Sequence, residues 1–111
     1  MLEIDENLVI SISQGDLLDI TFNVNGIDLN AGGEVYLTVK ENWQDETPCI
    51  FKQCSRIDGY ANKIRVIVPS SEMQGLKMGV YYYDLVYKVG RNKRTLNYPA
   101  RFIVREVVND A

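Results

Sequence analysis

The chain has 111 residues, of which 46% are hydrophobic and 24% charged, values typical of one globular domain and not of a disordered chain. Its formal net charge of −3 argues against a protein that grips nucleic acid through phosphates, because such proteins usually carry a basic surplus. No apolar run approaches the length of a membrane span, and the acidic N-terminus does not resemble a signal peptide. We therefore expect one domain, residues 1–111, that is made in a cytoplasm and binds neither nucleic acid nor membrane.

Alternation of apolar and polar residues dominates the first part of the chain, which is typical of half-buried β-strands. It predicts strands over residues 8–13, 18–24 and 35–40. The turn Gln14-Gly15-Asp16 separates the first two strands, and a polar loop over residues 27–33 precedes the third. The residues expected to face inward are Leu8, Ile10, Ile12, Leu18, Ile20, Phe22, Val24, Val35, Leu37 and Val39.

The middle of the chain holds the one plausible helical turn. A polar loop over residues 42–48 leads into a short predicted strand, residues 49–54, in which Phe51 is expected to face inward. A further strand, with Ile64, Val66 and Val68 inward, ends at Pro69. The helical turn follows over residues 70–75, capped by one of its two leading serines.

The last part predicts a hairpin. A long strand over residues 80–89 turns at 90–93 and returns over about 94–107. Pro99 interrupts the return strand, which therefore lies at an edge or bulges there. The inward residues of the return strand are Ala100, Phe102 and Val104.

Seven to eight short strands, with no helix long enough for a crossover, predict an all-β fold. We expect an immunoglobulin-like antiparallel β-sandwich with one short helical turn. Such sandwiches often carry a tyrosine where the chain enters strand F, and Tyr81 suits that corner; the other interpretation is that the tyrosines of this run merely favour strands. The predicted core between the sheets contains Phe22, Leu37, Val66, Leu85 and Phe102.

The order and spacing of these segments resemble a known family, the N-terminal sandwich domain of baseplate upper proteins and related short tail or virion proteins of phages of Gram-positive bacteria. The matching segments are Gln14-Gly15-Asp16, Leu18-Asp19-Ile20-Thr21-Phe22, Val35-Tyr36-Leu37-Thr38-Val39-Lys40, Ile50-Phe51-Lys52, Pro69 with the 70–75 turn, Gly79-Val80-Tyr81-Tyr82-Tyr83-Asp84-Leu85 and Ala100-Arg101-Phe102-Ile103-Val104. The resemblance implies a structural tail or baseplate component, a virion protein made in the bacterial cytoplasm. It implies assembly with other virion proteins or with itself as a homo-oligomer, and no catalytic residues.

The residue inventory offers little for catalysis. The chain has no histidine, which removes the commonest general base and the usual nucleophile–histidine pairs. Asp16 and Asp19 are three apart, so they point to opposite faces of a strand. We expect no enzyme activity, no cofactor and no metal site.

For three local patterns we prefer a structural interpretation to a functional one. Asp28 and Asn30 have the alternate spacing of a calcium loop, but turn residues that bond their own backbone are the simpler explanation. The basic run over residues 91–94 is expected at a solvated hairpin tip, although it suits an acidic partner. Cys49 and Cys54 lie about 16 Å apart along an extended strand, too far for a disulfide, so two free thiols are predicted.

One surface is a candidate for binding. In an immunoglobulin-like arrangement Tyr36, Tyr82, Val86 and Ile103 would share the outward face of one sheet and form an apolar patch, a feature that tends to mark interfaces. The alternative is that a loop or the 70–78 segment of the same chain covers them. The alternative function is a module that binds a carbohydrate or a surface protein.

Overall fold

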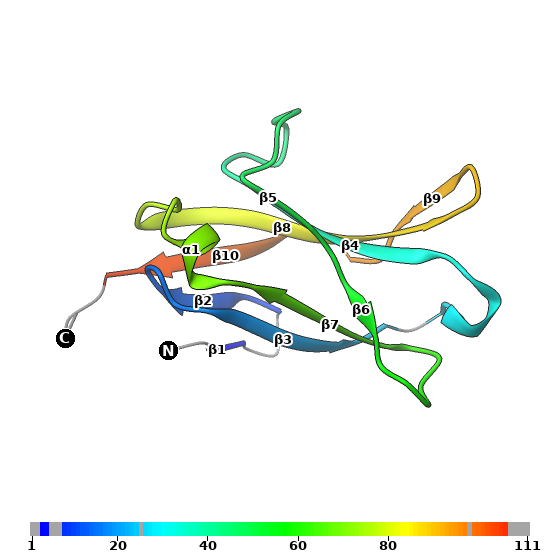
Figure 1. The fold of residues 1–111 in the computed structure, drawn as a ribbon. Helices are drawn as coiled ribbons and strands as arrows, with labels where there is room; N and C mark the ends of the chain where they lie inside the picture. Colours follow the sequence, from blue (N-terminus) through cyan, green and yellow to red (C-terminus); the bar gives the residue numbers. More distant parts are fainter. Residues whose placement is uncertain (1–2, 5–7, 25, 98, 107–111) are drawn as a thin grey trace.

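The computed structural model describes residues 3–4, 8–24, 26–97 and 99–106, with only the backbone of the first pair. They form two β-sheets packed face to face (Figure 1). The larger sheet has the order β1 (Glu3–Ile4), β2 (Ile10–Ser13), β10 (Ala100–Arg105), β8 (Gly79–Val89), β4 (Glu34–Lys40) and β5 (Ile50–Gln53), and β9 (Asn92–Thr95) also pairs with β8. The smaller sheet has the order β3 (Leu18–Asn23), β7 (Lys63–Val68) and β6 (Ser55–Arg56).

The topology is that of an immunoglobulin-like sandwich, as the sequence predicts. Strands β4, β8 and β10 are neighbours in one sheet, whereas β3 and β7 pair in the other. Among the described residues the ladders are antiparallel, except that β2 runs parallel to β10. The described residues form ten strands rather than seven or eight. Two of the additional strands, β1 and β6, have two residues each, too few for alternation to reveal.

The core lies between the two sheets and is built by the alternation of each strand. All five residues predicted for it belong to one buried cluster: Phe22 and Val66 from the smaller sheet, and Leu37, Leu85 and Phe102 from the larger. Two inward assignments are wrong. Leu8 precedes β2 with a φ of 64° and is exposed. In β5, Ile50 faces the core and Phe51 faces solvent, because two adjacent apolar residues allow either register and the strand adopted the other one.

The helical segments are short. The 3₁₀ helix η1 spans Leu29–Ala31, and α1 spans Ser70–Met73. The predicted serine cap of α1 is wrong, because Pro69 occupies the N-cap position and no side chain bonds there. No helix in the described part of the chain is long and apolar enough to cross a membrane.

The structure confirms the tyrosine corner and the interruption at Pro99, but not an edge position for the return strand, because β10 lies between β2 and β8. The hydroxyl of Tyr81 donates a hydrogen bond of 2.8 Å to the carbonyl of Lys77, the corner bond expected where the chain enters β8. Pro99 lies in the gap between β9 and β10. Across that gap the amide of Leu85 donates to the side-chain oxygen of Asn97 at 2.8 Å, so the interruption keeps a hydrogen bond to β8.

Candidate interaction face

The four residues of the candidate patch lie on the same side of the larger sheet. Tyr36 is directly opposite Val86, and Tyr82 is directly opposite Lys40, four residues farther along each strand. Ile103 on β10 is opposite Val80. We call this side the outer face, which carries Phe51, Glu34, Tyr36, Thr38, Lys40, Val80, Tyr82, Asp84, Val86, Lys88, Lys93, Thr95, Arg101 and Ile103.

The structure corrects one member of the patch. Tyr36, Tyr82 and Ile103 are half-buried, but Val86 is only 6% exposed and does not reach solvent as predicted. Val86 lies between Tyr36 on β4 and Thr95 on β9, each directly opposite it in its ladder. Neighbours on both sides therefore shield its short side chain.

Two exposed aromatic residues, which sequence reasoning missed, enlarge the patch. Trp43 is 58% exposed and its ring centroid lies 5.8 Å from that of Tyr82. Phe51 is 50% exposed and lies 5.0 Å from the ring of Tyr36. Trp43 lies in a loop that the sequence predicts to be polar, and nothing in the sequence indicates its position. The sequence predicts Phe51 in the core, although its apolar neighbour Ile50 is a signal that Phe51 can face outward instead.

Charged groups surround these rings. The ammonium of Lys88 lies 5.1 Å from the centroid of the Tyr36 ring and 5.6 Å from that of Phe51, within the range of cation–π attraction. The hydroxyl of Tyr36 donates a hydrogen bond to the carboxylate of Glu34, which raises the pKa of Tyr36. Burial raises the pKa of Asp84, and the positive charges of Lys40 and Lys93 partly oppose this effect.

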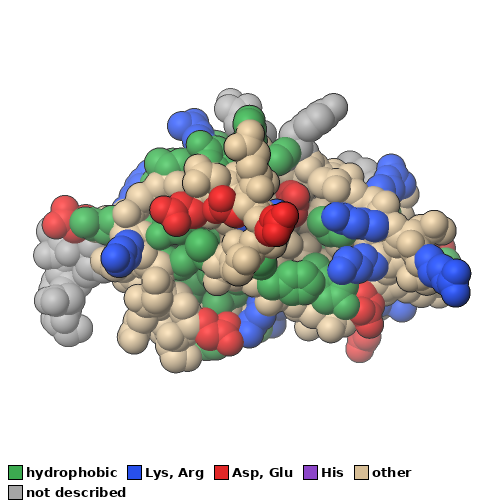
Figure 2. All heavy atoms as spheres, turned by 90° about the horizontal axis from the view of Figure 1, so that it is seen from above, with side chains coloured by type: hydrophobic (Ala, Val, Ile, Leu, Met, Phe, Trp, Pro, Cys, Tyr) green, Lys and Arg blue, Asp and Glu red, His purple; other side chains and the backbone are tan. Residues whose placement is uncertain are grey.

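The shape of the outer face follows from two projections. The loop over residues 41–49 and the β8–β9 hairpin both rise on this side of the larger sheet (Figure 1). Seen from that side, hydrophobic side chains lie exposed among charged ones, with acidic groups toward the middle and basic groups gathered at the end where the β8–β9 hairpin lies (Figure 2). The face therefore combines apolar area with an uneven distribution of charge.

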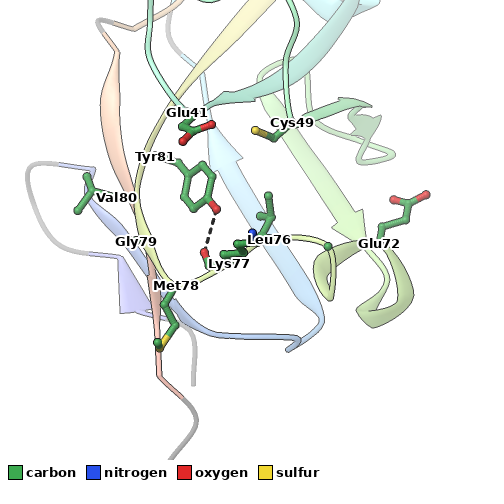
Figure 3. A pocket seen from close by; sticks show the side chains of 10 residues that line it. Glu41, Cys49, Glu72, Leu76, Lys77, Met78, Gly79, Val80 and Tyr81 are labelled. Carbon is green, nitrogen blue, oxygen red and sulfur yellow. Dashed lines mark hydrogen bonds between the residues drawn. The ribbon is translucent and has the colours of Figure 1, made fainter.

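A separate pocket of about 630 Å³ lies where β8 begins (Figure 3). Glu41, Cys49, Glu72, Lys77 and Tyr81 are among its lining residues. The Tyr81 hydroxyl is used by its bond to the carbonyl of Lys77, and Glu72 forms an ion pair of 2.7 Å with Lys52. Within the described ranges no three histidine, cysteine or acidic side chains come together as metal ligands. The Tyr81 hydroxyl and the Glu72 carboxylate of this pocket are thus both engaged with neighbouring groups of the fold.

Two acidic residues considered from the sequence, Asp19 and Asp28, have structural roles. Asp19 accepts two hydrogen bonds from Arg65 on the neighbouring strand, at 2.8 and 2.6 Å, and these lower its pKa. The side chain of Asp28 accepts from the backbone amide of Asn30 at 2.9 Å, which confirms the turn interpretation of that loop.

The two cysteines and the basic run also have defined places. Cys49 and Cys54 are both free, as predicted, the first exposed and the second buried. Burial raises the pKa of the Cys54 thiol to about 12. Within the basic run, Arg94 donates to the carbonyl of Gly26 at 3.0 Å, whereas Lys93 faces outward beside Lys88.

A scan against models of protein families finds no match for the chain, and a search of curated proteins finds none.

Proposed function

We propose that this chain is a non-catalytic structural component of a phage or prophage tail or baseplate, which acts by protein–protein assembly through the outer face. The observation that carries the proposal is the pair of exposed rings, Trp43 and Phe51, packed on Tyr82 and Tyr36 in one sheet face. The solvated face of an antiparallel sheet is normally polar. Aromatic residues are instead enriched at the centres of protein interfaces, where they contribute most of the binding energy.

The phage assignment rests on the resemblance in the order and spacing of the strand segments. Its partners would be other virion proteins or further copies of this chain, and its place would be the virion after synthesis in the bacterial cytoplasm. An immunoglobulin-like sandwich suits a structural role, because its rigid sheets hold a binding face in fixed geometry. The fold alone does not define the function, so the outer face is the part that must be tested.

The test is co-expression of the chain with the proteins encoded by neighbouring genes, followed by size-exclusion chromatography. We expect a complex that survives the substitution Tyr60→Ala, because Tyr60 is 46% exposed in the turn between β6 and β7 of the other sheet. The double substitution Trp43→Ala with Phe51→Ala should abolish the complex and leave the circular-dichroism spectrum unchanged. A complex of unchanged affinity in the double variant would rule out the outer face, and absence of the chain from purified tail particles would rule out the virion assignment.

A second candidate function is carbohydrate binding, favoured by one observation. Trp43 and Tyr82 border a small depression that is also lined by Thr38, Lys40 and Asp84. A sugar can pack its C–H face on an exposed ring and form hydrogen bonds with polar groups beside it. Calorimetric titration with polysaccharide from bacterial cell walls tests this function: it predicts saturable binding that Trp43→Ala removes, and no heat of binding would exclude it for the polymer used.

A further inference from the structure

We propose that the outer face binds the outer face of a second copy of this chain about a two-fold axis, with β4 of one copy antiparallel to β4 of the other. This inference names the partner of the interaction proposed above and so rests on that function.

The charge order along β4 is self-complementary. The outward residues of this strand are Glu34, Tyr36, Thr38 and Lys40, so one end of its outer face is acidic and the other is basic. When two such strands face each other antiparallel, Glu34 of each copy lies against Lys40 of the other. A two-fold axis makes this contact twice, as an isologous interface requires. The opposite orientation would place Glu34 against Glu34 and Lys40 against Lys40.

The neighbouring strand β8 supports the same axis. Glu34 is paired in the ladder with Lys88, and Lys40 is paired with Tyr82. On β4 the midpoint between positions 34 and 40 is Leu37, and on β8 the midpoint between positions 82 and 88 is Leu85. Because Leu37 and Leu85 are directly opposite each other, one two-fold axis can pass through both midpoints. One axis through this pair therefore brings Lys88 of each copy over the Tyr82 and Trp43 rings of the other, where cation–π attraction is expected.

The two projections of the face have opposite charge at the positions that this axis brings together. The 41–49 loop follows Lys40 and carries the carboxylates of Asp45 and Glu46. The β8–β9 hairpin follows Lys88 and carries Arg91 and Lys93. The axis that exchanges the two ends of β4 also exchanges these projections, so the acidic loop of each copy approaches the basic hairpin of the other. Complementary charges of this kind fix register and partner choice.

The area available is that of a small interface. Strands β2, β10, β8, β4 and β5 have 4, 6, 11, 7 and 4 residues. Each residue covers about 16 Å² of the sheet, from about 3.4 Å along the strand and about 4.8 Å between strands, so these strands give about 520 Å² per copy. Two copies together bury about 1,000 Å², the lower limit for a specific interface, so we expect a weak dimer.

The experiment is a charge swap measured by sedimentation velocity at low ionic strength. The wild-type protein should dimerise. Glu34→Lys alone or Lys40→Glu alone should raise the dissociation constant of the dimer at least about tenfold, because each substitution places like charges against each other at two symmetry-related positions. An equimolar mixture of the two variants should regain wild-type affinity as a heterodimer. The chain that carries both substitutions should regain it as a homodimer. Asp58→Lys, a reversal in the exposed turn of the smaller sheet, is the matched control and should change nothing.

Three results would overturn the inference. The first is a wild-type chain that stays monomeric, and the second is a dimer whose affinity neither single charge reversal changes. The third is a mixture of the two single variants that does not regain wild-type affinity. Circular dichroism of each variant separates loss of fold from loss of contact. If the chain is monomeric but its complex with neighbouring gene products still depends on Trp43 and Phe51, only the two-fold contact is wrong. If that complex is also missing, the proposed function fails as well.

Discussion

Replacing Phe102 by alanine should destabilise the fold by about 4 kcal/mol. Phe102 is completely buried on β10, directly opposite Ile10 of β2 and Tyr81 of β8, and its ring meets that of Tyr83 edge-on at 6.4 Å. Loss of the ring removes about 2 kcal/mol of hydrophobic transfer free energy. A residual cavity of roughly 80 Å³, at about 24 cal/mol per Å³, adds about 2 kcal/mol. Since small domains have about 5–15 kcal/mol in total, the variant should fold with a much reduced margin.

The assay is urea unfolding followed by far-ultraviolet circular dichroism, with the free energy taken by linear extrapolation. Phe51→Ala is the matched control, because the same ring is lost from a half-exposed site on the outer face. It should cost less than about 1 kcal/mol. If Phe102→Ala also costs less than about 1 kcal/mol, or if the two variants lose equal stability, the register of β10 against β2 and β8 is wrong.

Three further outcomes are expected. Tyr81→Phe should cost about 1 kcal/mol in urea unfolding through loss of the corner hydrogen bond, and an equal effect of Tyr82→Phe would show that the corner is not special. Alkylation without reductant should modify Cys49 in the native protein but Cys54 only after unfolding; mass spectrometry that finds a bridge between them would contradict the structure. The raised pKa of Asp84 means that the folded state binds the extra proton, so wild-type stability falls as pH rises from the ordinary pKa of 3.8 through the raised value. Asp84→Asn should therefore be more stable than wild type at pH 7 and equal at pH 3, and a difference that does not vary with pH would refute this origin.

Alternation made the long strands predictable. Strands β3, β4, β7 and β8 each have at least six residues, and over that length one register buries the alternating apolar residues while the other would expose them. The corner tyrosine was predictable for the same reason, since its place is defined by the start of β8. The short strand β5 has four residues with Ile50 and Phe51 adjacent, so the sequence allowed both faces and the wrong one was chosen.

The candidate face was predictable in its strands but not in its loops. Parity along β4, β8 and β10 places Tyr36, Tyr82 and Ile103 on one side once the immunoglobulin-like strand order is assumed. Loop conformation has no period, so nothing in the sequence indicates that Trp43 folds back onto Tyr82. The shielding of Val86 depends on β9: the sequence predicts that the hairpin turns over 90–93, whereas β9 already begins at Asn92 and its register places Thr95 opposite Val86.

The parallel pairing of β2 with β10 has a consequence for how the chain reaches its native state. Phe102 lies opposite Ile10, 92 positions away along the chain. Bringing such distant segments together costs loop-closure entropy before the contacts between them form and compensate for it. Proteins rich in such pairings fold in milliseconds to seconds. On the ribosome, β3 can meet β7 and β4 can meet β8 while β2 still has no partner in β10. Ile10 and Ile12 are fully buried in the folded protein. Until β10 has been synthesised, these side chains lack the strand that packs beside them and can be bound by chaperones or by other nascent chains.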